Sequence, residues 1–214
     1  MEIAYIILGW LFGILSPSVI RKISNQHKKK KIENIILVDL KDVKKRLAML
    51  QFNIFLRYGK LTKKGFEWTK DQMKVYRKSE IDFNYQEQYE KITKTEDNLN
   101  DFLESGNKQD LKEKISFGTN SIRMNIGESK LFNLELLDDE FLENLFEIKF
   151  KINMFNDEVK NVEWFVRKTF DSGVSSDNYS IILMEIERKN LLLANQSISI
   201  VDKINLFNKY KKNN

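Results

Sequence analysis

The chain has 214 residues with no cysteine, one histidine, one proline and eight glycines. The lack of cysteine excludes a disulfide framework, a thiolate metal site and a cysteine nucleophile, while the scarcity of helix breakers favours long helices. The net charge of +5 is unevenly spread: residues 21–78 hold 18 Lys and Arg against 5 Asp and Glu, a net of +13, whereas residues 79–202 hold 14 against 25, a net of −11.

The first predicted element is the uncharged stretch from Ile3 to Ile20, which a basic cluster follows at once. A helix needs about 20 mostly apolar residues to cross a bilayer. With the positive-inside rule, the pattern predicts a transmembrane anchor at residues 1–22 in the cell membrane, single-pass, with the N-terminus outside and the C-terminal domain cytoplasmic. A cleaved signal peptide and a buried helix of a soluble protein are the alternatives.

Two glycines and the proline of this stretch fall at helical spacing. Gly9 and Gly13 form a G-x-x-x-G pattern, and Pro17 follows four residues later on the same face. Small residues along one face let two membrane helices approach closely. We therefore expect a transmembrane contact at these three positions, with self-association as its consequence.

Residues 23–31 are predicted to be a basic juxtamembrane segment. Basic side chains near an inner leaflet are attracted to anionic lipid by about 1 kcal/mol each. The expected lipid contacts are Arg21, Lys22, Lys28, Lys29, Lys30 and Lys31.

The remainder, residues 32–212, is predicted to be a helical bundle domain. Its first helix, residues 32–58, has apolar residues at steps of four and three, which is a seam for packing against other helices. Nothing between the anchor and this helix forbids one continuous bent rod. Beyond a turn that contains Gly59 and Gly65, a less regular helix is expected at residues 66–104 and a shorter one at 108–126.

The clearest apolar pattern lies at residues 134–170. Additional large side chains widen its stripe, so we expect a bundle core there; they are Phe146, Phe150, Met154, Trp164 and Phe165. A five-residue turn leads to the last helix, residues 177–211, and predicts an antiparallel hairpin. The predicted fold class is all-α: one N-terminal transmembrane helix, then a cytoplasmic bundle of four to five long helices with a C-terminal antiparallel hairpin.

Residues with recognisable catalytic chemistry are scarce. His27 is the only histidine, so a histidine-based metal site or catalytic triad has no basis. Asp139, Glu143 and Glu147 share one helical face and resemble ligands for a hard cation such as Mg²⁺. Acids in a first helical turn also stabilise the helix dipole, and this is the preferred interpretation. We predict no enzyme activity, no catalytic or metal-binding residue and no cofactor.

The leading functional interpretation is a membrane-anchored interaction or scaffold protein whose bundle binds a protein partner or itself. The acidic distal part is a natural face for a basic partner, such as the basic part of a neighbouring copy. The first alternative is a membrane-perturbing effector of the toxin or phage-defence type, which acts through oligomerised anchors. The second is a soluble nucleic-acid binder that uses residues 28–78, although nucleic acid is not the partner we expect.

Overall fold

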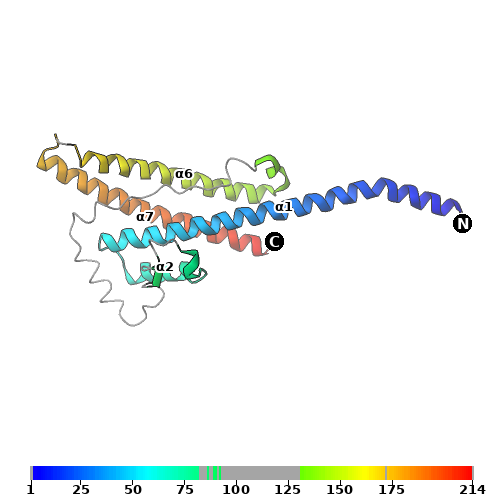
Figure 1. Cartoon of the computed structure of the whole chain (residues 1–214), viewed down its shortest axis with the longest axis horizontal. Coiled ribbons are helices and arrows are strands. Elements are labelled where there is room, and N and C mark those ends of the chain that lie inside the picture. Colours follow the sequence, from blue (N-terminus) through cyan, green and yellow to red (C-terminus); the bar gives the residue numbers. More distant parts are fainter. Residues whose placement is uncertain are drawn as a thin grey trace.

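The computed structural model describes residues 2–81, 86, 89–90, 92, 131–171 and 173–213. This part of the chain is all-α (Figure 1), which confirms the predicted fold class at that level. Its elements are α1 (Glu2–Arg57), α2 (Lys63–Met73), the short 3-10 helices η1 (Lys78–Glu80) and η4 (Leu131–Leu136), α6 (Asp139–Lys168) and α7 (Ser176–Asn213).

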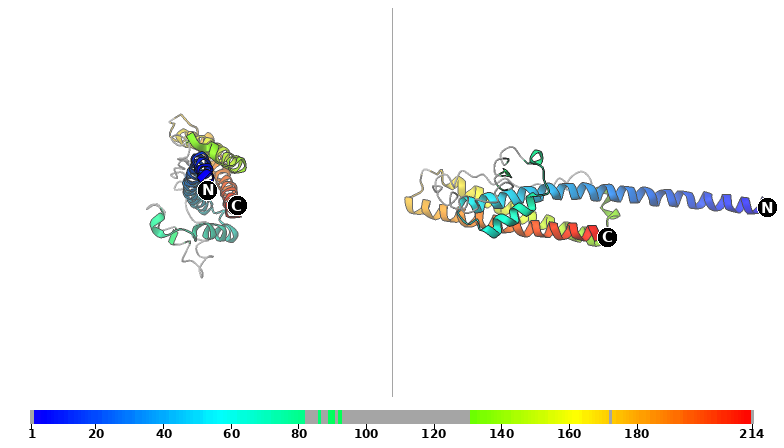
Figure 2. Two further views of the ribbon diagram at one scale, coloured as in Figure 1. Left: turned by 90° about the vertical axis from the view of Figure 1, so that its right-hand side faces the viewer. Right: turned by 90° about the horizontal axis from the view of Figure 1, so that it is seen from below.

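Helix α1 is 56 residues long, which corresponds to about 84 Å at 1.5 Å per residue. Its C-terminal half lies in the bundle, and its N-terminal half projects past the ends of the other helices (Figures 1 and 2). The helix is continuous through the basic residues 21–31. This confirms the expectation that the first segment and the first bundle helix form one rod.

Three long helices make the main core. Helices α1 and α6 run in the same direction, and α7 runs antiparallel to both and packs against both (Figure 1). The predicted seams are confirmed, because they are buried in a common cluster: Ile36, Leu40, Val43, Leu47, Leu50, Ile54 and Tyr58 from α1 and the residue after it, and Phe141, Leu145, Ile148, Ile152, Phe155, Val159 and Val162 from α6. Burying a side chain of this size contributes about 1.5–3 kcal/mol.

Helix α1 is also buried on a second side. There Ala48, Met49 and Phe52 pack against Phe66 and Met73 of α2. The turn before α2 places Gly59 at φ 62°, a conformation that glycine adopts without strain. At the start of α2, the side chain of Thr62 accepts a hydrogen bond from the backbone N–H of Gly65 at 3.1 Å. The bundle half of α1 thus contributes buried side chains to two apolar clusters.

The α6–α7 hairpin is confirmed. An ion pair of 2.8 Å between Lys189 Nζ and Glu158 joins its two helices. Deeper in the bundle, Asn190 Nδ2 donates a hydrogen bond of 2.9 Å to the hydroxyl of Tyr58, which ties α7 to the end of α1. Buried polar groups need such partners, so this contact helps to fix the alignment of α7 against α1.

The prediction that the additional large side chains of α6 belong to the core is wrong for four of the five. Phe146, Phe150, Met154 and Trp164 are 50%, 63%, 51% and 54% exposed. The neighbours of α6 lie on the side of its Phe141–Val162 seam, so apolar residues on the opposite side face solvent. Phe165 is half-buried and contacts Trp164 edge-on, with 4.8 Å between the ring centroids.

The prediction of a membrane anchor is contradicted. Among the helices of the described chain, none has a stretch both long and apolar enough to cross a membrane. The described side chains of α1 are those of Gly13 and residues 17–57. Within this part the uncharged stretch ends at Ile20, and the helix continues into Arg21 and Lys22 without a break. The stretch is therefore shorter than the about 20 apolar residues that a membrane span needs. The single-pass anchor at residues 1–22 and its N-terminus-out placement are corrected accordingly.

The predicted helix at residues 108–126 cannot be compared with the structure, and the one at residues 66–104 can be compared only in part. Residues 108–126 and most of residues 82–104 lie outside the described residues. The described start of the second predicted helix, residues 66–104, differs from the expectation, since α2 ends at Met73 and η1 follows at Lys78–Glu80.

Tyr76 provides a prediction about alkaline stability. Its hydroxyl donates to the carbonyl of Lys41 at 2.8 Å, and burial, together with the nearby carboxylates of Asp42 and Glu80, raises the pKa of Tyr76. The folded chain therefore keeps this phenol neutral after the unfolded chain ionises it near pH 10. Its stabilising contribution is complete below that pH and is lost as the pH rises further.

We expect the unfolding free energy of the wild-type chain to decline more steeply above about pH 10 than that of Tyr76→Phe. Urea unfolding at a series of pH values measures both slopes. Near neutral pH, Tyr76→Phe is less stable by about 0.5–1.5 kcal/mol because it lacks the hydrogen bond to Lys41. Equal alkaline slopes for the two chains contradict this assignment.

Candidate functional site

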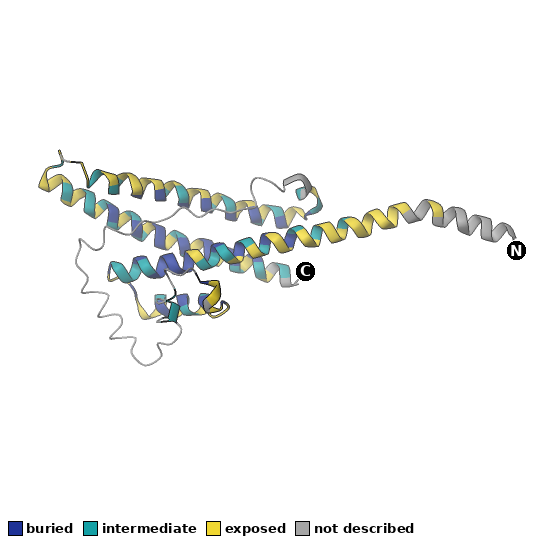
Figure 3. Ribbon diagram, viewed as in Figure 1, coloured by how far each residue is buried: buried dark blue, intermediate teal, exposed yellow. Residues whose placement is uncertain are grey.

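The projecting part of α1 contains a basic and partly apolar surface. We call residues 18–31 the arm. Figure 3 shows that the described part of this projection is almost entirely exposed, in contrast to the buried stripe of the bundle half. Ile20 and Ile23 are 63% and 50% exposed, and Val19 is exposed as well. The arm therefore presents aliphatic side chains to solvent beside its charges.

The six residues predicted to contact anionic lipid all lie on the arm. Five of them are exposed and have no ion pair within the described residues: Arg21, Lys22, Lys28, Lys30 and Lys31. Lys29 differs, because it is half-buried and its Nζ lies 2.6 Å from Asp138 Oδ1. The hydrogen bond from Lys29 holds the pKa of Asp138 below its ordinary value. The arm thus keeps five cations available to a partner.

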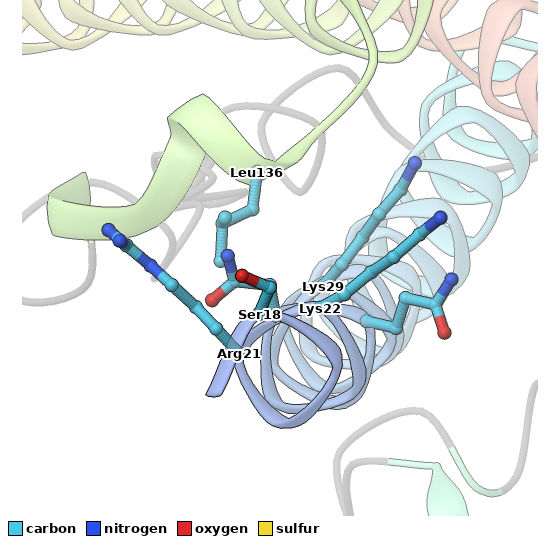
Figure 4. A pocket seen from close by; sticks show the side chains of 7 residues that line it. Ser18, Arg21, Lys22, Lys29 and Leu136 are labelled. Carbon is cyan, nitrogen blue, oxygen red and sulfur yellow. The ribbon is translucent and has the colours of Figure 1, made fainter. Parts of the chain in front are cut away.

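A pocket of about 410 Å³ lies between the arm and η4 (Figure 4). Arg21 extends from α1 toward η4, and Lys22 and Lys29 line the same hollow with Ser18 and Leu136. No carboxylate is among its lining residues in the described chain. The pocket is therefore a concave and positively charged part of the arm surface.

Two ion pairs hold α1 at the point where it leaves the bundle. One is the contact of Lys29 with Asp138, the residue just before α6. The other joins Lys211 of α7 to Glu33 of α1 at 2.8 Å. Glu33 is only 4% exposed, and Lys211 also lies 5.8 Å from the ring centroid of Phe141. These contacts connect the base of the arm to both helices of the hairpin.

The side of α6 away from the core forms a second surface, which we call the outer face of α6. Its exposed apolar residues Phe146, Phe150 and Met154 follow at i, i+4 and i+8. Asp139 and Glu143 lie on the same side of the helix and are exposed, without an ion pair in the described part of the chain. The outer face is thus apolar and acidic.

The acidic cluster considered for a cation does not form a metal site. No group of three or more His, Asp or Glu side chains suited to hold a metal occurs among the described residues. Glu147 instead pairs with Lys203 of α7 at 2.5 Å. Asp139 and Glu140 lie in the first turn of α6, where carboxylates stabilise the helix dipole.

The predicted contact strip of Gly9, Gly13 and Pro17 is not tested. A Cβ at Gly13 meets no atom within 4 Å, so no neighbour in the described chain requires a glycine there. The surroundings of Gly9 lie outside the described residues. Pro17 lies inside α1, which continues on both sides of it.

In comparisons with known proteins, no protein-family model, no curated protein and no solved structure matches this chain. The sequence pattern identified the cations of the arm. It missed Asp138 as the partner of Lys29, since the two residues are 109 positions apart, and it missed the outer face of α6 because large apolar side chains were assigned to the core.

Proposed function

We propose that this chain is a helical interaction protein in which the bundle holds out the arm, and the arm binds an acidic surface of a protein partner. The observation that carries this proposal is the continuation of α1 beyond the packed helices. There it presents five exposed cations and three exposed aliphatic side chains.

The physical chemistry of a lone helix supports a partner for the arm. Helices without tertiary packing are marginally stable in water, and like charges three or four positions apart weaken them further. Lys28 and Lys31 are such a pair. The positions three and four residues after Lys22 hold the uncharged Asn25 and Gln26, so no acid there pairs with Lys22 along the helix. An acidic partner relieves this repulsion, and its apolar groups bury Val19, Ile20 and Ile23.

Binding rather than catalysis is the activity that these groups favour. The single histidine, His27, is exposed on the arm between cations. Lysine and arginine beside aliphatic side chains provide charge attraction and apolar contact area. A protein surface that combines carboxylates with apolar side chains matches both properties, whereas a phosphate backbone matches only the charges.

A binding experiment with three probes tests the proposal. The probes are a fluorescent helical peptide with a glutamate face and a leucine stripe, vesicles of phosphatidylcholine with added phosphatidylglycerol, and duplex DNA. We expect the peptide to bind most tightly, with an affinity that falls as salt is raised. Lys30→Glu with Lys31→Glu removes this binding, whereas the matched pair Lys63→Glu with Lys64→Glu, exposed on α2, leaves it intact.

Preferential binding to the vesicles or to the DNA overturns the proposal of a protein partner and assigns the arm to lipid headgroups or to nucleic acid. An equal loss in the two charge-reversed variants also overturns it, since net charge alone then accounts for the binding. Circular dichroism of each variant confirms that the helical content is unchanged.

A further inference from the structure

We infer that the acidic partner is a second copy of this chain, and that the arm of one copy lies antiparallel on the outer face of α6 of the other. This inference rests on the proposed function, because it names the partner of the same arm. It joins two exposed surfaces of the described chain, each of which combines apolar side chains with charges of one sign, and the signs are opposite.

The two surfaces are complementary in composition. On the arm, Ile20, Ile23, His27 and Lys30 recur at steps of three, four and three, which places them on one side of the helix with Lys31 beside them. On α6, the outer face supplies aromatic and aliphatic groups for the isoleucines and carboxylates for the lysines. Aliphatic contact and charge pairing are therefore available together along one pair of helices.

The spacing of the groups fits an antiparallel alignment. Ile20 and Lys31 are eleven positions apart, as are Phe150 and Asp139, and the same interval separates Met154 from Glu143. At 1.5 Å per residue this interval is about 16 Å. When Ile20 and Ile23 lie against Phe150 and Met154, Lys30 and Lys31 reach Asp139 and Glu143 at the start of α6.

A parallel alignment is less favourable. With the isoleucines against the same aromatic stripe, Lys30 and Lys31 then lie opposite the second half of α6. On the outer face of that half, Asp157 already pairs with Lys160 at 2.8 Å, and beside it Glu158 pairs with Lys189 of α7. By contrast, Asp139 and Glu143 have no ion pair within the described residues. Charge complementarity thus selects the antiparallel orientation.

The arm cannot make this contact within its own chain. It extends away from the bundle, and its base is fixed by Lys29 and Asp138 at the start of its own α6 (Figures 1 and 2). A twofold rotation instead places the arm of each copy along the bundle of the other, so both contacts form at once. The outer face lies opposite the buried seam of α6, and docking there leaves the core unchanged.

Sedimentation equilibrium of the full chain over a range of concentrations tests the inference. We expect a monomer–dimer equilibrium for the wild-type protein. Phe150→Glu raises the dissociation constant by about tenfold or more, whereas Val38→Glu does not, because Val38 is an exposed aliphatic residue of α1 outside both surfaces. Unchanged circular dichroism separates lost association from lost folding.

A charge exchange gives the sharper result. Lys30→Glu with Lys31→Glu weakens the dimer, as does Asp139→Lys with Glu143→Lys, and the chain with all four changes regains the dimer because each contact again pairs opposite charges. A weakened dimer without recovery in the fourfold variant overturns the antiparallel pairing. A wild-type chain that stays monomeric at every concentration overturns self-association.

The outcomes distinguish this inference from the proposed function. If the wild-type chain is monomeric yet its arm binds the acidic helical peptide, the second copy is excluded as partner and the interaction protein stands. If the chain dimerises and neither surface responds to charge reversal, the dimer forms elsewhere and the inference fails. If the arm binds neither the peptide nor a second copy, both proposals fail.

Discussion

Phe155→Ala is expected to lower the free energy of unfolding by about 3–5 kcal/mol, the usual range for truncating a buried aromatic side chain. Phe155 is 0% exposed and lies in the common core of α1, α6 and α7. Removing its ring forfeits contacts that the three rigid helices cannot replace by a small shift, so a cavity remains. Urea unfolding followed by circular dichroism measures the change.

Phe150→Ala is the matched control, with the same chemical change five positions earlier on the same helix. Because Phe150 is 63% exposed, we expect a change within about 0.5 kcal/mol. It is measured at a concentration where the chain is monomeric, so that association adds nothing. Similar losses for the two variants contradict the assignment of the buried and outer sides of α6.

The second large effect is expected at the base of the arm. Lys211→Met removes the partner of Glu33, whose side chain is almost fully buried while Lys211 is partly exposed. A buried carboxylate without its cation is costly. Because solvent reaches one side of this pair, we expect a loss of about 1–3 kcal/mol rather than the full cost of a dry pair.

Lys209→Met provides the comparison, since Lys209 is exposed two positions away on the same helix. It is expected to change the unfolding free energy by no more than about 0.5 kcal/mol. Combining Lys211→Met with Glu33→Gln recovers part of the loss, because the carboxylate is then replaced by a neutral amide. No difference between the two lysine variants removes the structural role assigned to the Glu33 pair.

The seams of the bundle could be predicted because a helix buried on one side must repeat its apolar residues at steps of three and four. Leu40, Val43 and Leu47 of α1 show this pattern in the sequence and are buried in the structure. The same rule does not say how many neighbours a helix has. Phe150 therefore seemed as suitable for a core as Phe155, and only the arrangement of the three helices separates them.

The surfaces were less accessible to sequence reasoning. The cations of the arm are adjacent in the chain and so were easy to identify, but their fixed partners are distant: Lys29 meets Asp138, and Glu33 meets Lys211. Hydropathy also favoured a membrane span, a prediction that is contradicted because none of the described helices has a stretch long and apolar enough to cross a membrane. Local patterns thus predicted helices, and long-range packing decided which charges remain free.

The position of α7 has a consequence for synthesis of the chain. This last helix packs against both α1 and α6, so the seam of α1 has no complete core until residues near Phe207 leave the ribosome. At about 5–20 residues per second, the interval after Tyr58 emerges is roughly 7–30 s. During that time Ile36, Leu47 and Ile54 are open to other proteins, and a nascent chain that stalls before α7 is a natural substrate for chaperones.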